Sequence, residues 1–90
     1  MERDLYIYDR KTSKNITTGM CLDRLTGYLY KFHIINRSDK AITKDIIVNI
    51  VNTYFEDLKK SDILVVELLK DSIKVNGEVR WIHKIQKLMT

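Results

Sequence analysis

The chain of 90 residues has no proline, three glycines and one cysteine. So little proline and glycine excludes collagen-like chains and the Pro/Gly-rich class of disordered proteins. Cys21 stands alone, so the sequence offers neither an internal disulfide nor a cysteine cluster for zinc. A single thiol of this kind is most often a small core residue, which is the role we expect for Cys21.

Long hydrophobic runs are also missing. No apolar stretch approaches the roughly 20 residues that a membrane-spanning helix needs. The opening residues, MERDLYIYDR, carry charges where a secretory signal would have an apolar segment. We therefore expect no membrane association and a cytoplasmic location, either in a cell or in an infected host.

Motifs that carry chemistry are absent as well. The three glycines are isolated, so there is no glycine loop for phosphates, and no nucleophile elbow is present. The spacing of Cys21, His33 and His83 does not encode a metal site or a thiol dyad. We expect no enzyme, no cofactor and no metal, and we assign no catalytic residue.

The composition is that of one folded domain. Hydrophobic residues make up 44% of the chain and charged residues 31%, which indicates a single globular domain over residues 1–90. The net charge of +4 permits binding to nucleic acid or to an acidic protein surface. The many isoleucines and lysines suggest an AT-rich coding sequence, as in low-GC bacteria, their phages and some other viruses.

The first third of the chain predicts strands. Residues 4–9 alternate as a strand, and the polar residues 10–19 indicate a loop or a loose hairpin connection. Residues 20–35 fit either two strands around a turn at 25–27 or one helix. Gly27 inside that helix would cost about 1 kcal/mol, and the aromatic content favours strands.

The clearest pattern is a helix from about Thr43 to Lys60. Apolar residues recur there at helical spacing, and Thr43 is suited to cap the helix. Residues 62–69, DILVVELL, follow as an apolar strand that we expect to be buried on at least one face.

The pair Asn76-Gly77 predicts a C-terminal hairpin. With Gly77 in a three-residue loop, Lys74 would face Glu78 and Ile73 would face Val79. Residues 79–89 could instead form an amphipathic helix. The predicted fold is α+β: a small antiparallel sheet with one main amphipathic helix, about 43–60, packed on one face, and a hairpin around Asn76-Gly77.

The segment 27–37, GYLYKFHIINR, raises the question of function. As a strand it places Tyr28, Tyr30, Phe32 and Ile34 on one face, and Lys31 with His33 on the other. Sheets that bind single-stranded nucleic acid stack bases on such aromatics. The predicted helix, however, needs an apolar face to cover, so we expect the aromatics to form the core.

Two functional hypotheses follow. The first is a small protein-binding module, such as a phage- or mobile-element-encoded regulator or inhibitor of a larger host protein, with Tyr6, Tyr8 and Trp81 as anchors. A homodimer through a sheet edge is a variant of this hypothesis. The second is direct nucleic-acid binding through a basic loop and C-terminal cations, namely Arg10, Lys11, Lys14, Arg80, Lys84 and Lys87.

Overall fold

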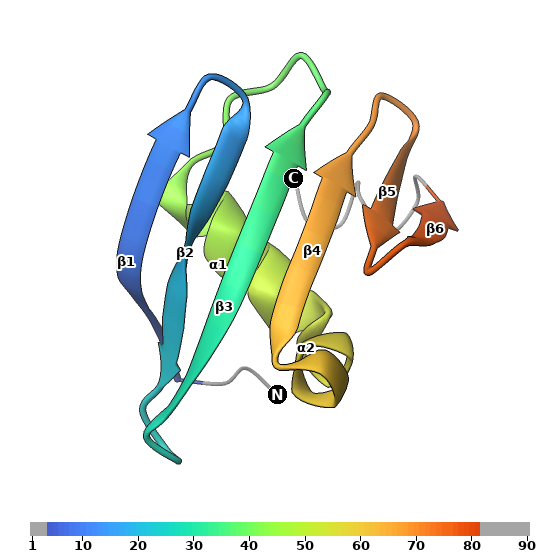
Figure 1. The fold of residues 1–90 in the computed structure, drawn as a ribbon. Helices are drawn as coiled ribbons and strands as arrows, with labels where there is room; N and C mark the ends of the chain where they lie inside the picture. The colour runs from blue at the N-terminus through green and yellow to red at the C-terminus, as the bar shows by residue number, and fades with distance from the viewer. Residues whose placement is uncertain (1–3, 82–90) are drawn as a thin grey trace.

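The computed structural model describes residues 4–81, and of Trp81 the backbone alone. Its elements are β1 (Leu5–Ser13), β2 (Ile16–Asp23), β3 (Tyr28–Asn36), α1 (Lys44–Thr53), α2 (Phe55–Ser61), β4 (Ile63–Leu68), β5 (Ser72–Val75) and β6 (Glu78–Trp81). The strands form one six-stranded sheet in which spatial order follows chain order (Figure 1). The predicted α+β class is confirmed.

The sheet is mixed, whereas we predicted an antiparallel one. Neighbouring strands run antiparallel except for β3 and β4, which are parallel and pair from Lys31–Ile63 to Asn36–Leu68. The helices lie between these two strands in the chain. A strand that follows such a crossover returns in the direction of the strand before it, so the predicted strand–helix–strand order itself implies a parallel pair.

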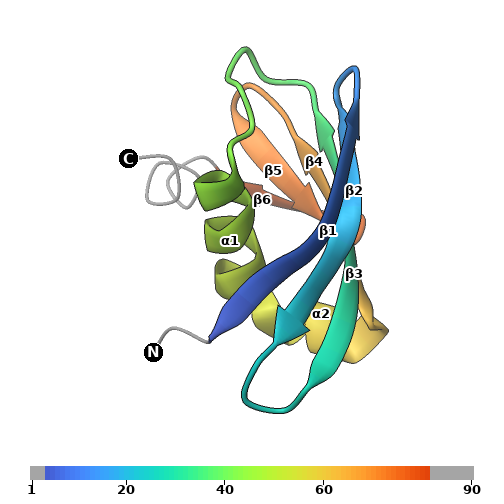
Figure 2. The same cartoon turned by 90° about the vertical axis from the view of Figure 1, so that its left-hand side faces the viewer.

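Both helices lie on the same side of the sheet (Figure 2). Tyr30, Phe32 and Ile34 of β3 point to that side and are buried, as are Leu64 and Val66 of β4. This confirms that the aromatics of β3 form the core. Tyr28, at the start of the strand, is half exposed and donates a hydrogen bond from its hydroxyl to Asp62.

The polar stretch 10–19 was predicted to be a loop or a loose hairpin connection, and it is the greater part of a tight hairpin. β1 continues to Ser13 and β2 begins at Ile16, with Lys14 at a φ of 55° in the turn. Gly19, which suggested a loop, lies inside β2. A Cβ atom there would stand 2.0 Å from the Asp9 carbonyl oxygen, so only glycine permits the approach of the two strands.

The single helix predicted over 43–60 is two helices that meet at Tyr54. The predicted cap is confirmed, because the Thr43 hydroxyl accepts a hydrogen bond from the Ile46 N–H at 3.2 Å. Tyr54 departs from helical dihedrals, with φ −108° and ψ 30°. Tyr54 and Phe55, adjacent in sequence, are both buried in the core at this break.

The C-terminal hairpin is present, but its predicted register is wrong. The turn has two residues, and Asn76 and Gly77 both have positive φ, as a type I′ turn requires. Val75 therefore faces Glu78, and Ile73 faces Arg80. The Asn76 side chain accepts a hydrogen bond from the Val65 N–H at 2.8 Å, and this bond ties the turn to β4.

Residues 79–81 belong to β6, so the alternative helix does not begin at 79. The remainder of that predicted helix, 82–89, lies outside the described residues.

Candidate functional site

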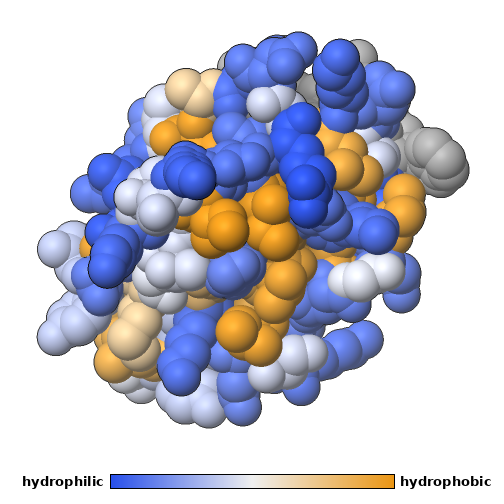
Figure 3. All heavy atoms as spheres, turned by 45° about the horizontal axis from the view of Figure 1, so that its top comes forward, coloured by the Kyte–Doolittle hydropathy of each residue, from blue (hydrophilic) through white to orange (hydrophobic). Residues whose placement is uncertain are grey.

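The face of the sheet opposite the helices is open over the part of the chain that the structure describes. Strand alternation and register place an apolar set on this face. Its members are Ile16, Met20, Leu22, Leu29, Ile35, Ile63, Val65 and Val79. We call these side chains the open-face patch. The space-filling view shows an apolar area on this side of the molecule, with hydrophilic residues around it (Figure 3).

The centre of the patch lies over the parallel strands β3 and β4. Leu29 is 40% exposed and Val65 is 37% exposed, although both occupy interior strands. Parallel strands are usually covered on both faces and read as near-continuous apolar runs. ILVVEL in β4 is such a run, but only one of its faces is covered by described residues.

Basic side chains interrupt the patch. Lys31 and His33 stand on the open face of β3, with Lys31 between Met20 of β2 and Ile63 of β4. Lys74 lies on the same face of β5, opposite Glu67. Glu67 is ion-paired with Arg37. The open-face patch therefore surrounds a basic centre on β3.

The three predicted anchors do not come together. Tyr6 and Tyr8 are exposed on β1, at 40% and 61%, whereas Trp81 ends β6. These strands form opposite edges of the sheet, so the three residues do not form one cluster. The Tyr6 ring, moreover, is covered by the Arg24 guanidinium at 4.8 Å from its centroid.

The predicted basic patch is also divided. Arg10, Lys11 and Lys14 lie on the β1–β2 hairpin, whereas Arg80 lies on β6 at the other edge. Lys84 and Lys87 fall outside the described residues.

The charge of Arg80 is compensated locally. Its guanidinium pairs with Asp57 at 3.1 Å and with Glu78 at 3.0 Å, and it lies over the Tyr54 ring. Arg80 thus joins α2 to the edge of the sheet, and its charge is already paired with two carboxylates. Burial raises the pKa of Tyr54, a change that the Arg80 charge partly offsets.

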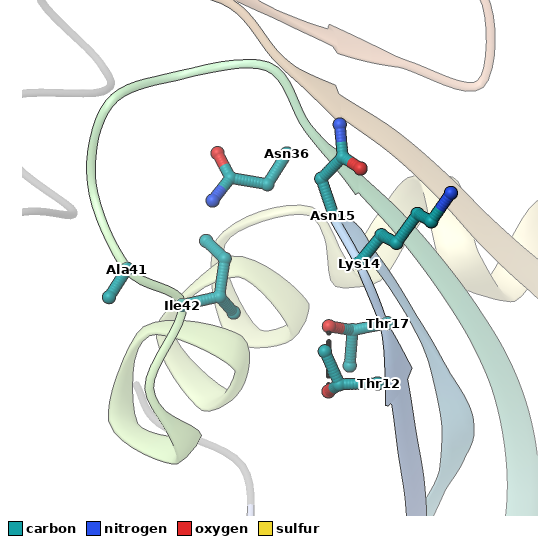
Figure 4. Close-up of a pocket in the computed structure, with 7 residues that line it drawn as sticks. All are labelled: Thr12, Lys14, Asn15, Thr17, Asn36, Ala41 and Ile42. Carbon is teal, nitrogen blue, oxygen red and sulfur yellow. Dashed lines mark hydrogen bonds between the residues drawn. The ribbon is translucent and has the colours of Figure 1, made fainter.

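A small cavity of about 230 Å³ lies at one end of the sheet, where the β1–β2 hairpin meets the segment before α1 (Figure 4). Thr12 and Thr17 share a hydrogen bond of 3.1 Å between their hydroxyls on one wall, and Ile42 forms the other. The Asn36 amide next to it already bonds Ser38 and Lys40, and the Lys14 amine points away from the space.

Reactive groups are few in the described region. Burial raises the pKa of the Cys21 thiol to about 11, with a smaller contribution from the charge of Asp23. The thiol is therefore protonated and shielded at neutral pH. Residues 4–81 contain no group of three or more His, Cys, Asp or Glu side chains placed to hold a metal ion. Neither described helix is long and apolar enough to cross a membrane.

Comparison of the chain with protein-family models, with curated proteins and with solved structures found no match.

The residues of the open-face patch were not among those predicted from the sequence. The available signal was the apolar character of both faces of residues 63–68, combined with a single covering helix. Met20, Leu22 and Leu29 also alternate with buried residues on the neighbouring strands. The sequence predicted apolar side chains on both faces of the sheet but only one helix to cover them. One apolar face was therefore left without a cover.

Proposed function

We propose that the chain is a small protein-binding module that docks on a partner protein through the open-face patch. The observation that carries the proposal is the exposure of a contiguous apolar set on interior strands, because such areas commonly mark interaction sites. Lys31 lies within this set and Lys74 lies beside it, so the partner surface we expect is apolar with acidic residues, and the charges would favour encounter.

Binding would follow from removing this patch from water. The exposed members contribute apolar area at about 25 cal/mol per Å² buried, and they stand on hydrogen-bonded strands that need no reordering. A preformed surface loses less conformational entropy on association than a flexible one. Regulation or inhibition of a larger protein fits a module of this kind, in which catalytic groups are not needed.

Capture of a partner by patch variants tests the proposal. The tagged protein is exposed to extract of the source cells, and retained proteins are quantified by mass spectrometry. We expect Val65→Asp to lose the specific partner, because a carboxylate is placed within the apolar contact. Leu25→Asp is the matched control, since Leu25 is an exposed apolar residue of the β2–β3 turn.

Circular dichroism establishes that each variant remains folded. Retention of the same partner at wild-type yield by folded Val65→Asp would show that the open-face patch is not the binding site. A wild-type dimer in sedimentation equilibrium that dissociates in Val65→Asp would replace the partner protein with a second copy of the chain.

A further inference from the structure

Lys31 differs in its surroundings from the other exposed lysines of the sheet. Its neighbours on the open face are Met20 on one adjacent strand and Ile63 on the other. Leu29 precedes it on the same face of β3, and His33 follows it. Lys31 is exposed, yet apolar side chains lie on three sides of it, so it is not at the rim of the patch.

No carboxylate of residues 4–81 pairs with the Lys31 amine. Asp9 lies on the same face but two strands away, at about 10 Å from the spacing of strands. Asp62 directly precedes Ile63, the residue opposite Lys31, but its carboxylate accepts a hydrogen bond from the Tyr28 hydroxyl. The Lys74 charge, in contrast, lies opposite Glu67.

A surface that covers Met20, Leu29 and Ile63 must also remove water from Lys31. An unpaired ammonium in that position would oppose binding, whereas a carboxylate from the partner would pair with it in an environment of reduced dielectric. The surrounding apolar contacts would exclude water from the pair, as they do around interface hot spots.

From this geometry we infer that Lys31 is the specificity-determining residue of the open-face patch and selects a partner that presents a carboxylate within an apolar surface. The inference rests on the proposed function and adds the chemistry of the partner. A second copy of the chain fits poorly, because it would bring its own Lys31 and Lys74 to the contact.

Nucleic acid is a less suitable occupant of the same face. Its phosphates could meet Lys31, but its bases stack on aromatic rings, and the central aromatics Tyr30 and Phe32 are buried beneath the helices. Of the side chains around Lys31, His33 carries a ring, whereas Met20, Leu29 and Ile63 are aliphatic or thioether groups. They complement the apolar side chains of a protein better than they complement bases.

Two small probes of equal chain length and opposite charge test the inference. Hexanoate and hexylammonium are titrated separately into the full chain, and methyl and amide NMR spectra are recorded. We expect hexanoate to shift the methyl signals of Met20, Leu29 and Ile63 and to bind about fivefold more tightly than hexylammonium, as for one partly exposed ion pair. Lys31→Gln should abolish this preference, while Lys74→Gln, the matched control, should retain it.

Equal binding of the two probes at the open face would overturn the carboxylate inference but leave the apolar docking surface standing. Failure of both to bind there, or a preference that survives Lys31→Gln, would also overturn the inference. A third titration uses a 20-nucleotide oligo(dT) as the nucleic-acid probe. Binding of oligo(dT) at the open face with a dissociation constant below about 10⁻⁶ M, and its loss in Lys31→Gln, would assign the face to nucleic acid. The capture experiment with Val65→Asp tests the proposed function separately.

Discussion

Cys21 illustrates how burial changes the chemistry of a residue. The thiol lies in β2 beneath the helices and is 1% exposed. Its pKa rises from 9.0 to about 11, chiefly because burial disfavours the thiolate. A core cysteine of this kind was the sequence-based expectation, and the structure confirms that Cys21 is buried and free.

The raised pKa predicts a loss of stability at alkaline pH. The folded state holds the thiol proton more tightly than the unfolded state. The associated stabilisation is thus complete below pH 9 and disappears as the pH rises through 11. Across this range, the free energy of unfolding should fall by up to about 3 kcal/mol.

Urea unfolding at pH 8, 9, 10 and 11 measures this loss for the wild type and for Cys21→Ala. Tyr28 and Tyr54 also have raised pKa values and act in the same direction, so only the difference between the two proteins reports on the thiol. If the free energy of unfolding fell equally with pH in the two proteins, the loss could not be assigned to Cys21.

At the scale of elements, the β5–β6 hairpin depends on one turn residue for two separate reasons. Asn76 adopts a left-handed backbone conformation, and its side-chain oxygen accepts the Val65 N–H. Its own N–H donates to the Val65 carbonyl oxygen at 2.8 Å. The turn is consequently joined to β4 as well as to the strands that it connects.

Two substitutions separate these contributions. Asn76→Gly removes the side-chain acceptor but suits the positive φ, and we expect a loss of about 1 kcal/mol in the free energy of unfolding. Asn76→Ala removes the acceptor and adds backbone strain, so we expect about 2 kcal/mol. Urea unfolding measures both, and equal stability of Asn76→Ala and wild type would show that the turn contributes nothing.

The sequence predicted most elements but not their fine geometry. Asn76-Gly77 marked the hairpin, and Thr43 marked the start of the helix, because both signals are local. The register was wrong because the prediction placed Gly77 in a three-residue loop, whereas Asn-Gly favours the two-residue type I′ turn that the structure has. In contrast, nothing local to residues 10–19 reveals that Gly19 must approach the Asp9 carbonyl.

At the scale of the whole molecule, the arrangement of strands determines which predicted residues can act together. The sheet holds β1 and β6 at opposite edges, which divides both the tyrosine–tryptophan set and the basic set. Because spatial order follows chain order, the strands farthest apart in the sequence are also farthest apart in the sheet. The helices cover the aromatic face of β3, and the face that carries Lys31 stays open among the described elements.

The divided basic set predicts weak nucleic-acid binding. We expect fluorescence anisotropy with labelled single- and double-stranded DNA and RNA to give dissociation constants no tighter than about 10⁻⁶ M at physiological salt, as for non-specific contacts. Arg80→Gln should change these constants little, because Asp57 and Glu78 already compensate the charge. Salt-dependent binding tighter than this, lost in Arg80→Gln, would support the nucleic-acid hypothesis.

The agreement of strand order with chain order has a consequence for synthesis on the ribosome. The strands β1, β2 and β3 can pair as soon as they emerge from the ribosome. Their apolar face then stays exposed until the helices have been synthesised. The cover is complete only after the 25 residues from Arg37 to Ser61 have been added. Synthesis adds about 5–20 residues per second, so the nascent sheet exposes Phe32 and Ile34 for about one to five seconds. We expect a chaperone to bind this exposed apolar face during that interval.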